Sequence, residues 1–263
     1  MLYLVYYTVL CYRCLEDGHK ETGVTILKTV LKMDAGPVVA VQNIQLDGTE
    51  TADILTNNLF KMGTQMFLDS CADIFRDTAV LKPQDESRVT FAPKISPEES
   101  IVDFGALTAQ QVFNRFRGFS EKPGIKAVFS REAGAQKKSK CGPARGSAPH
   151  TTGKDDSLES LVAPEYVQFE VKLNAVGLLL TGNGAAEASS ANSSEGDRIP
   201  VRYVVPNPQT PHPAIPEPLT SPYFEVTCFD GSKLAVTVLQ PSTRRTMTAK
   251  EFHNGNRKEP FFL

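Results

Sequence analysis

The chain has 263 residues, of which 41% are hydrophobic and 22% are charged, and its formal net charge is −2 at pH 7. This length and apolar content suffice for one large or two small cores, and the near-neutral charge excludes binding to nucleic acid through overall charge, so any RNA contact has to come from local basic patches. Five cysteines, an odd number, argue against a disulfide framework. We expect an intracellular or organellar protein without a metal ion.

The first twelve residues, MLYLVYYTVLCY, are apolar, but they are too short to span a bilayer and lack the charged start and the cleavage site of a signal peptide. We therefore expect no membrane contact. Their Tyr and Val content favours a buried strand. They also lack the Arg and Ser content of a transit peptide, and the alternative that Met1 is not the true start of the protein stays open.

A carboxylate on a tight turn is the first candidate for chemistry. Asp34-Ala35-Gly36-Pro37 lies between two apolar segments that we expect to be β-strands: Val24, Ile26 and Val30 to Met33 before the turn, and Val38 to Val41 after it. Because α/β folds place catalytic groups on loops at strand ends, Asp34 is a candidate catalytic residue. The alternative is an ordinary turn aspartate that bonds only its own backbone.

A long amphipathic helix is expected next, over Thr51 to Phe75. Its apolar residues recur at helical spacing, Thr51 is a suitable N-cap, and Asp53 lies in the first turn, where negative charge is favourable. The order strand, turn, strand, long helix is what the last third of a Rossmann-like α/β sheet would supply.

Two helix starts follow, each marked by a capping box: Ser96 to Glu99, with Pro97 at the first helical position, and Thr108 to Gln111. On the second helix we expect the apolar residues to face the core and the basic residues to point elsewhere: Arg115, Arg117 and, past the helix end, Lys122 and Lys126. Such a charge run is either a solvated face or an edge that contacts RNA phosphates.

Two segments have compositions that do not build a core. Residues 131–160 are rich in Lys, Gly, Ser, Ala and Pro, and residues 182–222 pass from Asn, Ser, Ala and Gly into the proline-dense VPNPQTPHPAIPEP. We expect both to be flexible inserts, the second containing a semi-rigid surface loop or, alternatively, a ligand for an aromatic groove.

Between and after these inserts the apolar pattern changes to a period of two. It predicts short strands, with a hairpin across Asp230-Gly231, whose alternating residues are Val167, Phe169, Val171, Leu173, Phe224, Val226, Cys228, Leu234, Val236 and Val238. Such strands favour a small closed barrel of the OB type, a scaffold often used for nucleic-acid contact. A third capping box, Thr248 to Glu251, opens a short helix in a basic tail that includes Arg244 and Arg245.

Several motifs together resemble the folate-dependent formyltransferases, and specifically the methionyl-tRNA formyltransferase family. They are GVTI at 23–26, MDAGPVV at 33–39, the linker segments between Pro83 and Phe104, Arg117-Gly118-Phe119 with Pro123-Gly124, and Leu239-Gln240-Pro241 through Glu251-Phe252. The resemblance covers residues 15–130 and 166–263. It implies an α/β remnant, the C-terminal part of a Rossmann-like formyltransferase domain, followed by a small β-barrel of OB type.

By this resemblance the chain divides into residues 13–82, the end of the catalytic domain, residues 83–107, the linker, and residues 108–263, the barrel domain with inserts at 131–160 and 182–222. In the family the catalytic Asp works with an Asn, a His and a Ser-Leu-Leu-Pro-type loop, all upstream, and we find none of them ahead of Asp34. His19 stands at a position that resembles a helix-end loop residue, so we do not assign it as the missing acid or base.

The family's activity is transfer of a formyl group from 10-formyltetrahydrofolate to methionine on initiator methionyl-tRNA, in translation initiation. Asp34 would be catalytic, and Gly36, having no side chain, would let the folate approach the turn backbone. Four basic residues would contact tRNA: Arg117, Lys122, Arg244 and Arg245. We expect little or no turnover from this chain, with a catalytically inactive RNA-binding module, or another 10-formyltetrahydrofolate-using transferase or hydrolase, as alternatives. We expect a monomer in the mitochondrial matrix, or otherwise in a plastid or the cytoplasm.

Overall fold

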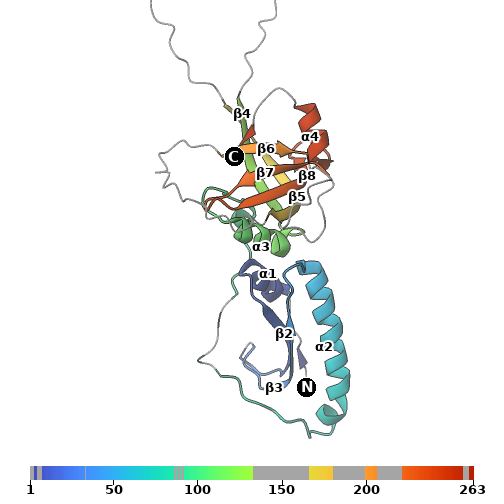
Figure 1. Cartoon of the computed structure of the whole chain (residues 1–263). Coiled ribbons are helices and arrows are strands. Elements are labelled where there is room, and N and C mark those ends of the chain that lie inside the picture. The colour runs from blue at the N-terminus through green and yellow to red at the C-terminus, as the bar shows by residue number, and fades with distance from the viewer. Residues whose placement is uncertain are drawn as a thin grey trace, which may run out of the picture.

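The computed structural model describes residues 3–4, 8–32, 34–85, 87, 90, 92–132, 166–179, 199–205, 221–256 and 261–263. Within these ranges the chain forms two lobes, and helices α1 (Thr8–Glu16) and α3 (Ala109–Phe119) pack against each other where the lobes meet (Figure 1). None of the helices in the described ranges combines the length and the apolar character that crossing a membrane requires.

The N-terminal lobe is built from a small sheet and one long helix. Strands β1 (Tyr3–Leu4), β2 (Glu21–Lys28) and β3 (Val38–Gln45) are antiparallel neighbours in that order, and α2 (Ala52–Phe75) packs against β2. Buried residues of α1, β2, α2 and the loop after β3 share one small core: Cys11, Leu15, Val24, Leu46, Ala52, Leu55 and Leu59. The predicted order of strand, turn, strand and long helix is confirmed.

Strand β2 ends earlier than the sequence predicts. Its last residue is Lys28, just after a register shift between Ile26 and Leu27 in the pairing with β3. Val30 and Leu31, which were expected to continue the strand, are exposed. Because a bulge bends and twists a strand and often ends its pairing, the apolar residues that follow lie on the loop that carries Asp34.

The predicted capping boxes are present, but they open different structures. Thr108 and Thr248 each accept a hydrogen bond from the backbone N–H three residues later, at the starts of α3 and α4 (Ala249–Gly255). The Ser96 box opens only a single 3-10 turn, η2 (Pro97–Ser100). Helix α2 begins directly after Thr51, as predicted, although the Thr51 side chain makes no capping bond.

The C-terminal lobe is rich in strands, which form one antiparallel sheet in the order β5-β4-β10-β6-β7-β8-β9, with a further pairing of β5 with β8. Their bounds are β4 (Ile125–Glu132), β5 (Tyr166–Leu179), β6 (Pro200–Val204), β7 (Tyr223–Thr227), β8 (Lys233–Pro241), β9 (Met247–Thr248) and β10 (Phe261–Phe262). The strand-rich character is confirmed, and the closed OB-type barrel stays a prediction.

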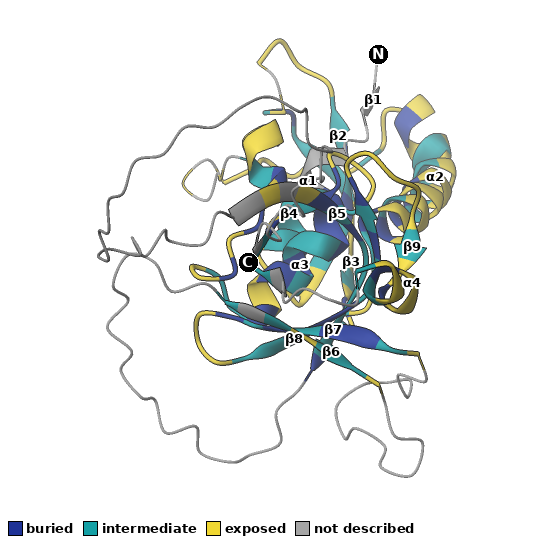
Figure 2. Cartoon of the chain, turned by 90° about the horizontal axis from the view of Figure 1, so that it is seen from above, coloured by how far each residue is buried: buried dark blue, intermediate teal, exposed yellow. Residues whose placement is uncertain are grey.

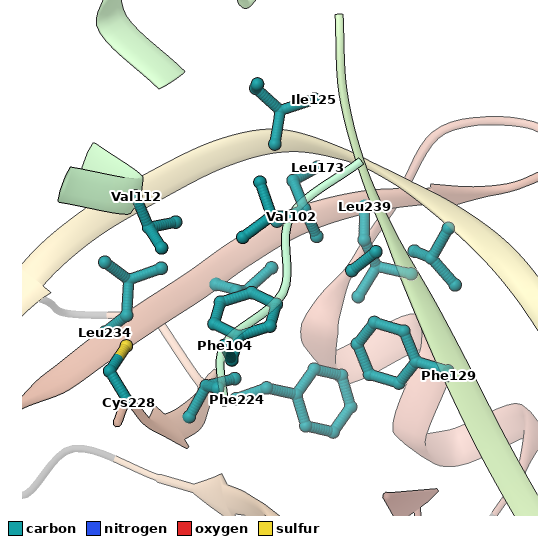
Figure 3. Close-up of a cluster of buried hydrophobic side chains, with 14 of the residues drawn as sticks. Val102, Phe104, Val112, Ile125, Phe129, Leu173, Phe224, Cys228, Leu234 and Leu239 are labelled. Carbon is teal, nitrogen blue, oxygen red and sulfur yellow. The ribbon is translucent and has the colours of Figure 1, made fainter. Parts of the chain in front are cut away.

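The larger hydrophobic core lies in this lobe. Side chains from the end of the linker, from α3 and from the strands meet there, including Val102, Phe104, Val112, Phe129 and Phe224 (Figure 3). Figure 2 shows buried segments in the strands and in α3, whereas most of α2 is half-buried or exposed. Burying each large apolar side chain stabilises the fold by about 1.5–3 kcal/mol, so this core anchors the linker and α3 to the sheet.

One predicted core position is wrong by a single residue. Val238 is half-buried, and its neighbour Leu239 is buried instead. The register shifts between β5 and β8 beside Ala175, so the face that points inward changes along β8. A one-residue slip moves side chains to the other face of a strand, and such a slip is not visible in a period-two pattern.

The predicted inserts are shorter than their sequence limits suggest. Residues 200–204 lie inside the segment 182–222, yet they form β6, which pairs with β7 and β10. Arg131 and Glu132 likewise continue β4. The insert prediction is therefore wrong for these residues, because two core-facing residues, Val201 and Tyr203, are too few to stand out beside a proline-dense sequence. Residues 133–160, 182–198 and 206–220 lie outside the described ranges.

Candidate functional site

Asp34 lies on the loop between β2 and β3, and its side chain is exposed. Its φ is 54°, in the left-handed region that few residues other than glycine occupy, although Asp and Asn enter it more readily than most. Among the described residues, no hydrogen bond or ion pair engages the Asp34 carboxylate. The interpretation that Asp34 only bonds its own backbone is therefore not supported, and its carboxylate can contact a ligand.

Gly36 is required by close packing of the backbone. A Cβ atom at this position would lie 1.7 Å from the carbonyl oxygen of Lys28, far inside van der Waals contact. The Lys28 N–H also donates to the carbonyl of Pro37 at 3.0 Å. A glycine is needed at position 36 because strand β2 occupies the space of a side chain. The sequence suggests a different reason, close approach of the folate.

Gln84, at the start of the linker, holds the same loop from the other side. Its Nε2 atom donates to the carbonyl oxygens of Asp34 and Gly36, each at 2.7 Å. Nearby, Val38 and Lys82 exchange two backbone hydrogen bonds, at 2.7 and 2.9 Å. Sequence reasoning did not single out Gln84, and its place in the linker motif is the only signal that points to it.

A cleft of about 930 Å³ lies at the other end of β2. Residues from α1, β2, α3 and the linker line it, among them Arg13, His19, Thr22 and Asn114, and Asp34 is not one of them. His19 precedes β2 and Asp34 follows it, and an eight-residue strand is about 25 Å long. The structure therefore keeps His19 and Asp34 apart, in agreement with the decision not to assign His19 as a catalytic partner.

Cys11 and Cys14 line the same cleft, and sequence reasoning overlooked their Cys-x-x-Cys spacing. Burial raises the pKa of both thiols above the ordinary value. A raised pKa leaves less of the reactive thiolate form at neutral pH. Among the described residues, no group of three or more His, Cys, Asp or Glu side chains is arranged to hold a metal ion.

Arg13 joins the N-terminal lobe to the linker. Its guanidinium donates to the two carboxylate oxygens of Glu99, at 2.5 and 3.1 Å, and to the carbonyls of Pro93 and Lys94, at 3.2 Å each. It also lies 5.7 Å from the centre of the Phe119 ring, within cation–π range. The hydrogen bonds from Arg13 lower the pKa of Glu99 to about 2, so this carboxylate is held in its charged form.

Arg117 is buried, and the expectation that it points away from the core is wrong. Only 4% of its surface is exposed. Its Nη2 donates to the Asn114 side chain at 3.0 Å, and its Nη1 lies 3.8 Å from the Glu50 carboxylate. Burial lowers the pKa of Arg117, and the charge of Glu50 opposes this effect. The side chain thus fastens α3 to the loop ahead of α2, a contact that sequence alone does not reveal because Glu50 is 67 residues away.

Lys122 is exposed, as predicted, and Arg244 and Arg245 are exposed as well. Strand pairing brings their segments to the same end of the lobe: β4 begins just after Lys122 and pairs with β5, and Asn174 of β5 donates to Thr246 at 3.1 Å. Lys172 of β5 lies between these two segments, and its side chain lies over Gly124. Its place beside the other basic residues follows from the strand register and is not visible in the sequence. Arg245 also forms an exposed ion pair with Glu251 at 2.9 Å.

Sequence comparison relates part of this chain to curated proteins. It is 39% identical over 117 residues to methionyl-tRNA formyltransferase of Thermotoga maritima, which is 44% of this chain and 37% of that protein. It is 36% identical over 113 residues to the same enzyme of Lactiplantibacillus plantarum, 43% of this chain and 36% of that protein. Over these residues the chain is similar to methionyl-tRNA formyltransferases. No family model matches the chain.

The chain spans between 36% and 39% of the length of the methionyl-tRNA formyltransferases that it matches. In fold it is similar to a variant of HypX from Aquifex aeolicus, with a TM-score of 0.53 at 13% identity over 95% of this chain and 36% of that chain. It is also similar to HypX in complex with tetrahydrofolic acid, with a TM-score of 0.52 at 14% identity over 97% of this chain and 35% of that chain. At these identities the likeness concerns the fold alone.

Proposed function

We propose that this chain carries part of a methionyl-tRNA formyltransferase, whose reaction moves a formyl group from 10-formyltetrahydrofolate to the amino group of methionine on initiator tRNA. The observation that carries the proposal is the geometry of Asp34. Its carboxylate is exposed on a tight loop at a strand end, within a motif that resembles the family's, and the loop backbone is bonded to β2 and to the linker.

The chemistry of this reaction is acyl transfer. The methionyl amine attacks the formyl carbon, an oxyanion develops on the formyl oxygen, and the bond to the folate nitrogen breaks while a proton leaves the attacking amine. By the family pattern Asp34 orients a His and favours its charged form, since an opposite charge nearby stabilises the imidazolium. The proposed folate contact of Gly36 runs through its backbone, because Lys28 occupies the space of a side chain.

We predict that the purified chain of residues 1–263 has little or no formyltransferase turnover. The sequence contains no counterpart of the family's Asn and His ahead of Asp34, and loss of an oxyanion stabiliser alone lowers turnover about 100- to 1000-fold. The test is a formylation assay with 10-formyltetrahydrofolate and methionyl-tRNA that quantifies formylmethionine. Turnover within tenfold of the Thermotoga maritima relative would contradict the prediction.

A catalytically inactive RNA-binding module is the second candidate. The separation of His19 from Asp34 favours it, as do the exposed basic residues gathered at one end of the C-terminal lobe. Filter binding at several salt concentrations distinguishes the two: tRNA affinity that falls with salt, without turnover, supports the module. Formyl transfer to a small amine in place of methionyl-tRNA would instead support another 10-formyltetrahydrofolate-using enzyme.

Three further expectations belong to the same proposal. The pairing of β5 with both β4 and β8 supports a closed OB-type barrel in the C-terminal lobe. A monomer is expected, and light scattering of the purified chain tests it. A mitochondrial location, which would match initiation with formylated methionine, is tested by imaging the protein in its own cells with organelle markers.

A further inference from the structure

We infer that Gln84 is a positioning residue, which fixes the backbone at Asp34 and thereby sets the direction of the Asp34 carboxylate. The catalytic meaning of this role rests on the proposed function, whereas the contacts themselves do not. Gln84 reaches the loop from the start of the linker, 50 residues further along the chain. The linker therefore helps to build the candidate site as well as connecting the lobes.

The first contact fixes the peptide unit that follows Asp34. The Gln84 amide nitrogen carries two hydrogens, and one of them binds the Asp34 carbonyl at 2.7 Å. That carbonyl shares a planar peptide unit with the N–H of Ala35, which donates to the carbonyl of Lys32 at 3.4 Å. Because both ends of this unit are bonded, its rotation is restrained, and with it the ψ angle of Asp34.

The second contact satisfies a carbonyl in a peptide unit that has no donor of its own. Gly36 precedes Pro37, which lacks an N–H, so the Gly36 carbonyl is the only polar backbone group of their shared peptide unit. The second Gln84 hydrogen binds it at 2.7 Å. In the next peptide unit, the Pro37 carbonyl accepts from the Lys28 N–H at 3.0 Å. Gln84 and β2 thus hold the loop between them.

Asp34 needs such support because of its conformation. A non-glycine residue with φ of 54° occupies a sparsely populated region, and such residues persist where the surroundings over-determine them. A group that acts in chemistry also has to be held within about 0.5 Å of its productive position by supporting hydrogen bonds. Gln84 meets both needs with one side chain.

The test replaces Gln84 by a residue of nearly the same shape. In Gln84→Glu the carboxylate accepts only, and at pH 7 it faces two carbonyl oxygens. The matched control is Gln42→Glu, which makes the same charge change at an exposed position of β3. We expect amide hydrogen exchange at Lys28 and Val38 to be roughly tenfold faster in Gln84→Glu, unchanged in Gln42→Glu, and unchanged in both at Val236 of the other lobe.

The pH dependence separates positioning from a general loss of fold. Below a pKa of about 4.3 the introduced carboxyl is protonated and regains one O–H donor. The backbone amide NMR chemical shifts of Ala35 and Gly36 in Gln84→Glu should then return part of the way toward the wild-type values at the same pH. Gln84→Ala, which has no donor at any pH, should show no such return. Wild-type exchange at Lys28 and Val38 in both Gln84 variants at pH 7 would overturn the inference.

Calorimetry with tetrahydrofolate distinguishes failure of this inference from failure of the proposed function. If the wild type binds tetrahydrofolate, we expect Gln84→Glu to bind it roughly tenfold more weakly and Gln42→Glu to bind it as the wild type does. Equal affinity in the wild type and Gln84→Glu would overturn a positioning role at a folate site. Absence of binding to the wild type, together with faster loop exchange in Gln84→Glu, supports the positioning role and counts against the proposed folate site.

Discussion

Gly36 determines how closely the Asp34 loop approaches β2. In Gly36→Ala the added carbon would meet the Lys28 carbonyl oxygen at 1.7 Å, and this oxygen belongs to the backbone, so it cannot move aside as a flexible side chain would. We expect the variant to lose about 1–3 kcal/mol of unfolding free energy, a typical cost of overpacking, and to displace the loop. Urea denaturation of the purified chain measures the loss.

Gly177→Ala is the matched control for this change. Gly177 lies in β5, and a Cβ there would have no atom within 4 Å and no positive φ to oppose it. We expect its stability to stay within about 0.5 kcal/mol of the wild type. If Gly36→Ala were equally stable, the backbone contact between the loop and β2 would not be the reason for a glycine at this position.

At the scale of elements, the Arg13–Glu99 pair joins α1 to η2, and it makes stability depend on pH. The pKa of Glu99 lies near 2 in the folded chain and at 4.5 ordinarily, so folding favours its ionised form. Its contribution is therefore complete above pH 4.5 and is lost as the pH falls from about 4.5 toward 2. We expect the wild type to lose stability in this window more steeply than a variant without the Glu99 charge.

Glu99→Gln is that variant, with Glu121→Gln, an exposed position past α3, as the control. Because the side chain of Glu99 is 28% exposed and solvent screens the pair, we expect Glu99→Gln to cost only about 1 kcal/mol at pH 7. The difference between wild type and Glu99→Gln should shrink between pH 4.5 and 3 in urea titrations, whereas the difference for Glu121→Gln should not. Parallel pH profiles for wild type and Glu99→Gln would refute the role of the pair.

The elements that sequence predicts well are those whose signals are local. The Thr108 box, the apolar spacing of α2 and the strand on either side of Asp34 each depend on residues within a few positions of one another, and the structure confirms them. The predictions that were wrong depend on residues elsewhere in the chain. The early end of β2 and the inward turn of Leu239 follow from shifts in register, and the pairing of β6 depends on partners elsewhere in the chain. Gln84 is the same case within the candidate site.

At the scale of the whole molecule, basic residues that are close in sequence have different roles, depending on whether they lie at the contact between the two lobes. Arg117 and Lys122 are five positions apart on one basic run, yet Arg117 binds Glu50 of the N-terminal lobe and Lys122 is exposed. Exposure of a charge depends on the packing of α3 against α1, which no local pattern reports. The basic run is therefore partly a joint between lobes and partly a candidate RNA surface.

This division predicts two kinds of variant. Lys122→Ala and Arg244→Ala remove exposed charges, so if each contacts one phosphate of methionyl-tRNA, the slope of log affinity against log salt should flatten by about 0.7–0.9 in each variant without a change in stability. Arg117→Ala removes the charged partner of Glu50, and we expect it to lose about 2 kcal/mol of unfolding free energy. Filter binding and urea denaturation of the same preparations measure both effects.

Lys61→Ala, which removes an exposed charge from α2 in the other lobe, controls for net charge and should change neither quantity. The comparison of Arg117→Ala with Lys122→Ala shows whether Arg117 joins the lobes or contacts RNA, because both changes remove one positive charge from neighbouring positions. An Arg117→Ala chain as stable as the wild type, with a salt slope flattened as in Lys122→Ala, would mean that Arg117 reaches RNA and that the lobes are joined without it. Loss of stability with an unchanged slope would instead leave tRNA contact to the exposed residues at the far end of α3 and in the turn after β8.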